Sequence, residues 1–376
     1  MVDSDSRQSE HTVSEELSSG WERVSNSISV ALIVSNESMG SSGGLEDPSP
    51  TNAPFWRDQE EIVISGVSGR FPRSENVQEF GDLLLAGEDL VTEDDLRWPP
   101  GIYDLPKRHG KLKDLKKFDA QFFSVTPKQA NFMDPQVRIL LEVAYEAMID
   151  AGINPNDMRG SKTGVFVGCS ASETGGALTQ DPESVTGYTL TGCVRSMFSN
   201  RLSYTFDLRG PSFSVDTACS SSLLALQLAV DAIRQDQCDA AIVAGAHLTL
   251  TPTAALQFLK LGMLSSAGSC RSFDQSGDGY CRTEGIAAII LQRHSQAKRI
   301  YATVVHAKSN TDGYKEQGIT FPVGERQAVL LEEVYREANI DPNTVKYVET
   351  HGTGTKVGDP QEAYAITQTF CSNRQV

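Results

Sequence analysis

Apolar residues in this chain occur in two patterns, which alternate along most of its length. Short continuous apolar runs are typical of buried strands, and a spacing of three or four residues is typical of amphipathic helices. The runs predict strands at 61–67, 163–169, 211–215, 240–245, 286–291, 301–305 and 345–349. The spacing predicts helices at 76–85, 135–150, 325–338 and 361–370, and another that begins after Cys219. Strands that alternate with helices predict an α/β fold whose sheets are covered on both faces.

The first 57 residues have a different composition, rich in Ser, Asp, Glu and, near the end, Pro. Such segments bury too little apolar surface to fold alone, so we expect a disordered leader at 1–57 and a globular domain at 58–376. The single apolar run of the leader, residues 28–34, is also compatible with a short docking strand.

Composition narrows the class of protein. With 376 residues, 39% of them hydrophobic, the chain can bury a sizeable core. Its net charge of −16 argues against nucleic acid or an anionic membrane as a partner. No apolar run approaches the length of a membrane span, and the seven cysteines show no CxxC pair. We therefore expect a cytoplasmic protein with reduced thiols.

The strongest candidate for chemistry is Cys219, in the string Ser-Val-Asp-Thr-Ala-Cys-Ser-Ser-Ser-Leu-Leu at 214–224. A strand is predicted before it and an amphipathic helix after it. Unpaired N–H groups and the macrodipole at a helix N-terminus favour a thiolate, which is the nucleophilic form of cysteine. We expect Ser220, Ser221 and Ser222 to supply capping hydroxyls. A buried structural cysteine is the alternative, and this strand–Cys–helix junction makes it the weaker one.

The string around Cys219 resembles the nucleophile motif of the β-ketoacyl synthases, the condensing enzymes of fatty acid and polyketide synthesis. A second match is His351-Gly-Thr-Gly-Thr355, which follows the predicted strand 345–349. The resemblance implies that His351 stabilises an enolate oxygen, as the first of two catalytic histidines. It also implies that Thr353 and Thr355 contact a pantetheine arm. A phosphate-binding loop would need Gly-Lys-Ser/Thr, which is missing.

A third stretch, residues 270–285, has an incomplete resemblance to a calcium loop. Asp274, Ser276 and Asp278 fall at the first, third and fifth positions of an EF-hand loop, but the twelfth is a glycine and Glu284 comes one residue early. We therefore predict no metal. The family resemblance implies a loop beside the active site, in which Glu284 anchors a hydrogen-bond network near the nucleophile.

The resemblance runs from about residue 60 to the C-terminus and implies a thiolase-like fold made of two duplicated α/β halves. Residues 110–115, 256–264 and 310–321 resemble the ketosynthase domain of animal type I fatty acid synthase. Polyketide synthases share the Cys219 and His351 motifs and are the alternative.

The activity implied is decarboxylative condensation of an acyl group on Cys219 with malonyl on an acyl carrier protein. The carrier's phosphopantetheine arm is implied, as is a homodimer, but no metal or redox cofactor. NADPH would enter only through reductase regions, which this chain does not contain.

One departure from the family pattern concerns the C-terminal half. Family members continue with a Lys-x-x-x-Gly-His segment that carries a second histidine, and the other histidines of this chain lie in no such context. We therefore expect an incomplete second half with an unpaired sheet edge, and a chain that is inactive in isolation. Two rival classes stay open at this point: a truncated, non-catalytic partner of a full synthase, and a cysteine hydrolase that uses Cys219 and His351.

Overall fold

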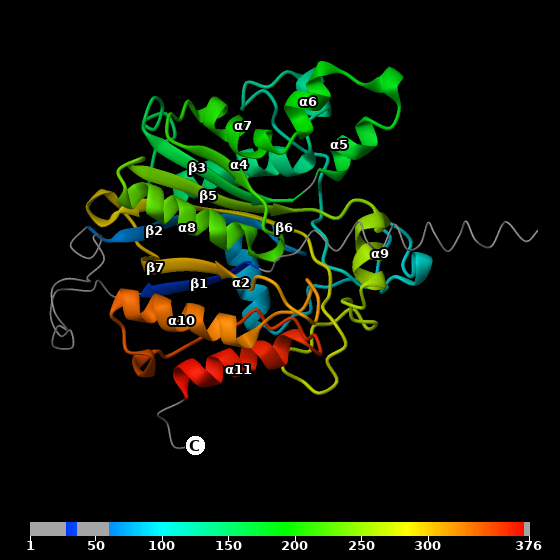
Figure 1. The fold of residues 1–376 in the computed structure, drawn as a ribbon. Helices are drawn as coiled ribbons and strands as arrows, with labels where there is room; N and C mark the ends of the chain where they lie inside the picture. The colour runs from blue at the N-terminus through cyan, green and yellow to red at the C-terminus, as the bar shows by residue number, and fades with distance from the viewer. Residues whose placement is uncertain (1–27, 36–59, 171, 372–376) are drawn as a thin grey trace, which may run out of the picture.

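A computed structural model describes residues 28–35, 60–170 and 172–371, and its strands form one curled sheet of seven (Figure 1). Their order across the sheet is β1-β7-β2-β6-β5-β3-β4. Strand β3 pairs in parallel with β4 and β5, and the other neighbours are antiparallel. The bounds are β1 (Ile28–Ser35), β2 (Ile62–Arg70), β3 (Thr163–Cys169), β4 (Ser212–Val215), β5 (Ala240–His247), β6 (Gly285–Arg293) and β7 (Ala302–Thr311).

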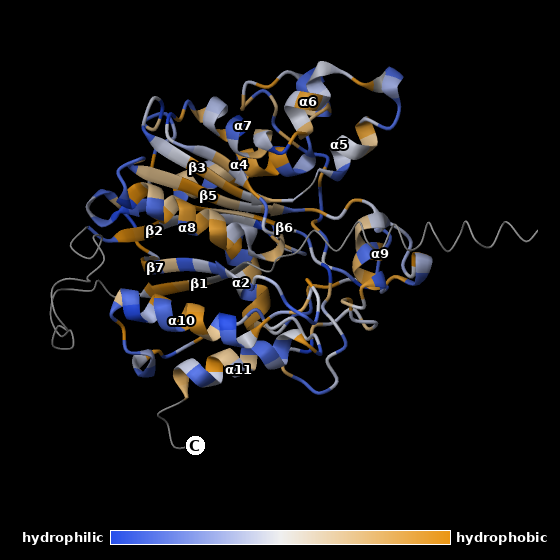
Figure 2. Ribbon diagram, viewed as in Figure 1, coloured by the Kyte–Doolittle hydropathy of each residue, from blue (hydrophilic) through white to orange (hydrophobic). Residues whose placement is uncertain are grey.

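Helices cover both faces of this sheet, as the alternating pattern predicts (Figure 1). One face packs on α4 and α7, the other on α8, and α10 and α11 cover β1 and β7 from outside. Figure 2 shows hydrophobic residues gathered on the strands and on the helix faces turned toward them. The bounds are α2 (Val77–Leu85), α3 (Pro127–Asn131), α4 (Pro135–Asp150), α5 (Glu173–Leu178), α6 (Gly187–Cys193), α7 (Ser196–Phe206), α8 (Ser221–Arg234), α9 (Pro252–Lys260), α10 (Gly324–Ala338) and α11 (Gly358–Phe370).

The strongest predictions from the sequence are confirmed. Every residue of β3 is buried, as its continuous apolar run requires. Helix α4 begins at Pro135, and the carboxylate of its N-cap, Asp134, accepts the backbone N–H of Gln136. Within the described residues, no helix is long and apolar enough to cross a membrane.

Residues 28–35 correct the expectation of a disordered leader over 1–57. They form strand β1, antiparallel to β7 from Ile28 opposite Thr311 to Ser35 opposite Thr303. The rest of the leader lies outside the described residues. A polar composition predicts disorder for a segment as a whole, but one apolar run is enough to extend a sheet whose edge is open. Strand β1 is the last strand at this end of the sheet, so its outer edge pairs with no other strand of the described residues.

The β1–β7 pair repeats the geometry of the β6–β2 pair. Strands β2 and β7 pair about a local twofold centred on Val63 and Thr303. Each of these two strands carries a one-residue register shift at its fourth residue. In β2 the shift is at Ser65, in its pairing with β6, and in β7 it is at Val305, in its pairing with β1. Strand β1 therefore lies on β7 as β6 lies on β2, which is the relation expected of duplicated halves.

The predicted strand at 345–349 is not formed. These residues pair with no strand in the described part of the chain. Val345 and Val348 nevertheless pack against the hydrophobic cluster that β1, α10 and α11 form. An apolar run becomes a strand only where a neighbouring strand offers hydrogen bonds. Strand β3, which has the same kind of sequence, has such a neighbour on each side.

Replacing Ile33 with alanine tests whether β1 is an integral strand. Ile33 is buried against α10 and α11, whereas the next side chain, Val34, is 48% exposed. We expect Ile33→Ala to lower the free energy of unfolding by about 2 kcal/mol. The matched change Val34→Ala should lower it by less than about 0.5 kcal/mol. Urea unfolding measures both, and equal small losses would contradict the packing of β1.

Candidate active site

Cys219 lies on a tight turn between a strand and a helix. Strand β4 ends at Val215, a short 3-10 turn covers Ala218–Ser220, and α8 begins at Ser221. The Cys219 side chain is exposed, whereas Cys169, Cys193 and Cys238 are buried. An accessible thiol at this junction is placed to react with a molecule from solution.

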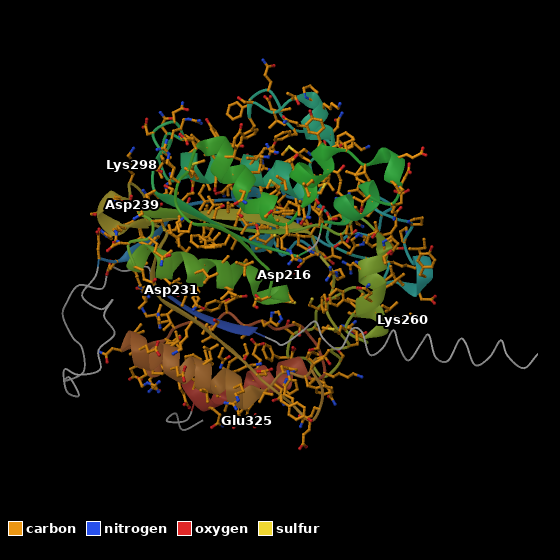
Figure 3. All side chains as sticks on the ribbon, turned by 45° about the horizontal axis from the view of Figure 1, so that its top comes forward. Asp216, Asp231, Asp239, Lys260, Lys298 and Glu325 are labelled. Atoms are coloured by element: carbon orange, nitrogen blue, oxygen red, sulfur yellow. The ribbon has the colours of Figure 1, made fainter. Side chains whose placement is uncertain are left out.

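The turn holds a strained backbone. Ala218 has a φ of 55°, in the left-handed region that residues with a Cβ rarely adopt. The hydroxyl of Ser221 accepts the N–H of Thr217 at 2.9 Å and donates to the Ala218 carbonyl at 2.6 Å. The carboxylate of Asp216, beside the start of α8 in Figure 3, accepts the Ala218 N–H at 3.1 Å. These bonds fix the residue that precedes Cys219.

Ser220 and Ser221 therefore do not cap α8 with their side chains as predicted. The N-cap of α8, Ser220, makes no side-chain cap bond, and its hydroxyl donates to the Thr217 carbonyl at 3.0 Å. A 3-10 turn directly before the helix turns the hydroxyls of Ser220 and Ser221 back toward the strand. The serines stabilise the turn and leave first-turn N–H groups of α8 without a serine partner.

Close packing fixes the start of α8 over the sheet. A Cβ added to Gly168, at the end of β3, would lie 2.5 Å from the backbone nitrogen of Ser222. Only glycine permits this approach, because such a contact is far shorter than atoms tolerate. The position of Cys219 is thus set by the strand ends as well as by its own turn.

One loop, residues 270–281, connects the surroundings of Cys219 to those of His351. Burial raises the pKa of Tyr280, and the nearby Cys219 and Cys270 thiols add to this effect. The Ser272 hydroxyl donates to the Gly352 carbonyl, and the Gly279 N–H donates to the Gly354 carbonyl at 3.0 Å. The two motifs singled out from the sequence therefore border the same loop.

His351 is exposed and, contrary to expectation, does not follow a strand. Two carboxylates that the sequence reasoning missed hold its loop. Glu362 of α11 accepts the N–H groups of His351 at 2.6 Å and Gly352 at 2.8 Å. Buried Asp359 accepts the N–H groups of Gly354 at 3.0 Å and Phe273 at 2.6 Å. Acidic residues just before and just inside the helix predicted at 361–370, directly after a glycine-rich loop, were the available signal.

The hydroxyls of Thr353 and Thr355 lie 3.0 Å apart in this loop. Thr353 also donates to Asp359 at 3.3 Å, and Thr355 accepts the Gly358 N–H at 3.1 Å. Both residues are partly exposed, so their hydroxyls stay within reach of a bound molecule. Their contact with a pantetheine arm remains a prediction.

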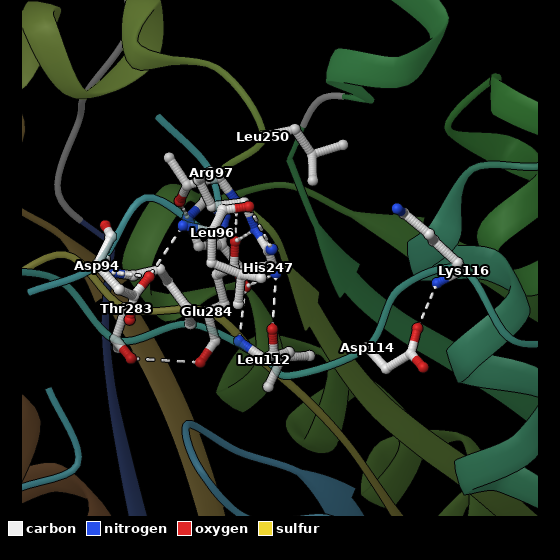
Figure 4. A network of polar contacts seen from close by, with 12 residues as sticks. Asp94, Leu96, Arg97, Leu112, Asp114, Lys116, His247, Leu250, Thr283 and Glu284 are labelled. Atoms are coloured by element: carbon white, nitrogen blue, oxygen red, sulfur yellow. Dashed lines mark hydrogen bonds and ion pairs between the residues drawn. The ribbon is translucent and has the colours of Figure 1, made fainter. Parts of the chain in front are cut away.

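Glu284 anchors a buried network, shown in Figure 4. Its carboxylate accepts two bonds from the Arg97 guanidinium at 2.7 and 2.8 Å. It also accepts the backbone N–H groups of Leu112 at 2.8 Å and Thr249 at 3.2 Å. These partners come from three separate segments, so Glu284 joins them to the start of β6; its effect on Cys219 stays a prediction.

Next to this network, His247 is kept neutral. Burial and the neighbouring Arg282 guanidinium lower its pKa to about 4. The ring therefore accepts from Arg282, whose Nη2 lies 2.8 Å from His247 Nε2. The guanidinium of Arg282 in turn lies over the Phe258 ring, 4.6 Å from its centre.

The residues of the incomplete calcium loop bond to their neighbours. Asp274 accepts the backbone and hydroxyl hydrogens of Ser276, and Asp278 accepts those of Ser266. Across the described residues, no group of three or more His, Cys, Asp and Glu side chains is arranged to hold a metal ion.

Comparisons with known proteins cover most of the chain. Residues 59–297 match the family model "Beta-ketoacyl synthase, N-terminal domain", and residues 301–376 match "Beta-ketoacyl synthase, C-terminal domain". Fatty acid synthase of Anser anser anser is 59% identical over 312 residues, which cover 83% of this chain and 89% of the goose sequence. Probable polyketide synthase 1 of Dictyostelium discoideum is 39% identical over 331 residues, or 84% of this chain and 10% of that protein.

Solved structures have the same fold. The ketosynthase from module 6 of the bacillaene synthase of Bacillus subtilis 168 superposes with a TM-score of 0.76 at 34% identity. The oxazolomycin ketosynthase domain OzmH KS7 of Streptomyces albus JA3453 gives 0.76 at 36%. Each match covers 83% of this chain, and the chain spans 55% and 56% of those two solved chains.

Proposed function

Because this chain belongs to the β-ketoacyl synthase family, with a thiolase-like α/β fold, we propose that Cys219 carries the acyl group in a decarboxylative condensation. The chain is a ketosynthase region of the fatty acid synthase type. Its identity to the goose enzyme is 59%, against 39% to the Dictyostelium polyketide synthase. The observation that carries the proposal is the exposed Cys219 thiol on a strained turn, next to the loop that holds the His351 segment.

The reaction proceeds in two halves. The Cys219 sulfur attacks the thioester of an acyl group on a carrier's pantetheine arm, and the pantetheine thiol leaves. A malonyl thioester then loses carbon dioxide, and its enolate carbon attacks the acyl-cysteine. A β-ketoacyl thioester forms on the second carrier, and the Cys219 thiol is released. The N–H of Cys219 stabilises the oxyanion in each attack.

The remaining site residues serve the malonyl half of the reaction. His351 stabilises the enolate oxygen, and the Glu362 carboxylate holds its backbone in place. Thr353 and Thr355 contact the pantetheine arm through their hydroxyls. Glu284, bound to Arg97, holds the segments around the site in position. No metal or redox cofactor takes part in this scheme.

The partners follow from the same chemistry. An acyl carrier protein with a phosphopantetheine arm delivers both thioesters, and the reaction takes place in the cytoplasm. A second copy of the chain pairs through β4, the last strand of the sheet, where the Phe213 side chain is 53% exposed. Edge strands with exposed apolar side chains are favourable sites for pairing between chains.

Selective alkylation tests the assignment of the nucleophile. With limiting iodoacetamide near neutral pH, followed by peptide mapping, we expect Cys219 to be labelled before the other six cysteines. Its side chain is exposed, and it lies on the short turn directly before α8. The fully buried Cys238 serves as the internal control and should stay unlabelled until the protein unfolds. Preferential labelling of Cys270, the other exposed thiol, would contradict the proposal.

A further inference from the structure

Two cysteines outside the proposed chemistry meet at the base of loop 270–281. The backbone N–H of Cys281 donates to the sulfur of Cys270 at 3.2 Å. An N–Cα bond is about 1.5 Å long, so the Cα of Cys281 lies less than about 5 Å from that sulfur. A disulfide places each Cα at a similar distance from the partner's sulfur, with the two Cα atoms about 4.4–6.8 Å apart. The backbone spacing of these two residues is therefore compatible with a disulfide.

The two thiols differ in accessibility. Cys270 is exposed, so a small oxidant in solution can reach it. Cys281 is partly buried, and its thiol donates to the Arg108 carbonyl at 3.8 Å and the Arg282 carbonyl at 3.5 Å. Burial raises the pKa of Cys281 to about 11, and the nearby Cys270 thiol adds to this shift. Redox-sensitive cysteines are accessible to solvent and often lie next to a second cysteine that can form a disulfide with them.

We propose that Cys270 and Cys281 form a reversible disulfide when the protein meets a peroxide. The Cys270 thiolate attacks one peroxide oxygen, the O–O bond breaks, and hydroxide leaves, so Cys270 becomes a sulfenic acid. The Cys281 sulfur then attacks the Cys270 sulfur. The S–S bond forms, the S–O bond breaks, and the hydroxyl group leaves as water with the thiol proton. Two thiols are oxidised, one peroxide is reduced to two waters, and a dithiol reverses the change.

The disulfide closes the loop that holds the His351 segment. Between the two cysteines, Ser272 donates to the Gly352 carbonyl, and the Phe273 N–H donates to Asp359. To reach Cys270, the Cys281 sulfur turns away from the Arg108 and Arg282 carbonyls. A bond at the base of the loop therefore changes the mobility of residues 350–359. Formation of the bond does not depend on the proposed condensation.

Tryptic mapping of the whole chain under non-reducing conditions tests this proposal. Cleavage after Lys260, Arg271 and Arg282 places Cys270 in peptide 261–271 and Cys281 in peptide 272–282. After hydrogen peroxide treatment we expect these peptides to be linked, with loss of both free thiols, and dithiothreitol should separate them. Cys281→Ser should remove the link and leave a Cys270 sulfenic acid that dimedone traps. Cys371→Ser, a change in another partly buried thiol, should leave the link unchanged.

Three results would overturn the proposal. Cys270 could link instead to peptide 210–234, which carries Cys219. Dimedone could trap Cys270 in the unaltered chain without any link to Cys281. Or Cys270 could stay reduced while Cys219 is oxidised. A thermal melt of each variant shows whether it is folded, and none of the three results bears on whether Cys219 accepts an acyl group.

Discussion

Replacing Cys219 with alanine is expected to abolish acyl loading of this chain from an acyl-pantetheine thioester. The loaded group is bound to the Cys219 sulfur, so no other residue can substitute for it. Intact-mass spectrometry after incubation with the thioester measures the loading directly. Cys270→Ala removes the other exposed thiol and should leave the loading unchanged. Persistent loading of Cys219→Ala would show that another nucleophile carries the acyl group.

The variant His351→Ala separates the two halves of the reaction. It should still be loaded on Cys219, because His351 acts on the malonyl group. In any form of the enzyme that condenses substrates, we expect it to lower the rate by about a hundred- to a thousandfold, the usual cost of losing an oxyanion donor. A block of loading, with condensation retained from enzyme already acylated, would show that the roles are reversed.

The parts of the fold that the sequence predicts are those whose signal is local. The fully buried β3 follows from an unbroken apolar run, and α4 follows from its Asp134 and Pro135 start. The junction at Cys219 was found because strand, turn and helix follow each other directly along the chain. Such elements can be predicted from the local sequence, since a window of about ten to twenty residues contains the whole pattern.

Two of the incorrect predictions depended on a partner elsewhere in the chain, and a third on the turn beside it. The run at 345–349 has the composition of a strand but has no strand beside it in the described residues. The run at 28–34 is also short, yet it forms β1 because β7 offers an edge. Ser220 and Ser221 have the side chains of helix caps, but the turn around Ala218 uses their hydroxyls instead. For the two runs tertiary structure outweighs the local preference, and for the serines a local turn does so.

Two of the functional residues that were missed are acceptors for backbone groups. Asp359 and Glu362 hold the glycine-rich loop by accepting its N–H groups, and such a role leaves no periodic trace in a sequence. Arg97 lies 187 positions before Glu284, so no local window contains both. The resemblance to a family pointed to Glu284, but only the structure identifies the partner that neutralises it.

Replacing Glu284 with alanine is expected to lower the free energy of unfolding by about 3–5 kcal/mol. The change leaves the Arg97 guanidinium, whose side chain is only 7% exposed, without its counter-ion. It also removes the acceptor of the Leu112 and Thr249 N–H groups. Glu284→Gln keeps an oxygen for those N–H groups but removes the charge, so a smaller loss is expected. Urea unfolding of the folded variants measures the losses.

The pair of Glu93 and Lys107 is the matched control for this prediction. It is also an ion pair, 3.8 Å long, but its side chains are 53% and 66% exposed. Water already solvates both charges, so Glu93→Ala should change the free energy of unfolding by less than about 0.5 kcal/mol. Similar losses at Glu284 and Glu93 would mean that the buried network is hydrated and does not hold its three segments together. A much larger loss at Glu284 than at Glu93 would show that Glu284 holds its three segments in position. The difference would follow from burial, because an unpaired charge is costly only where water is excluded.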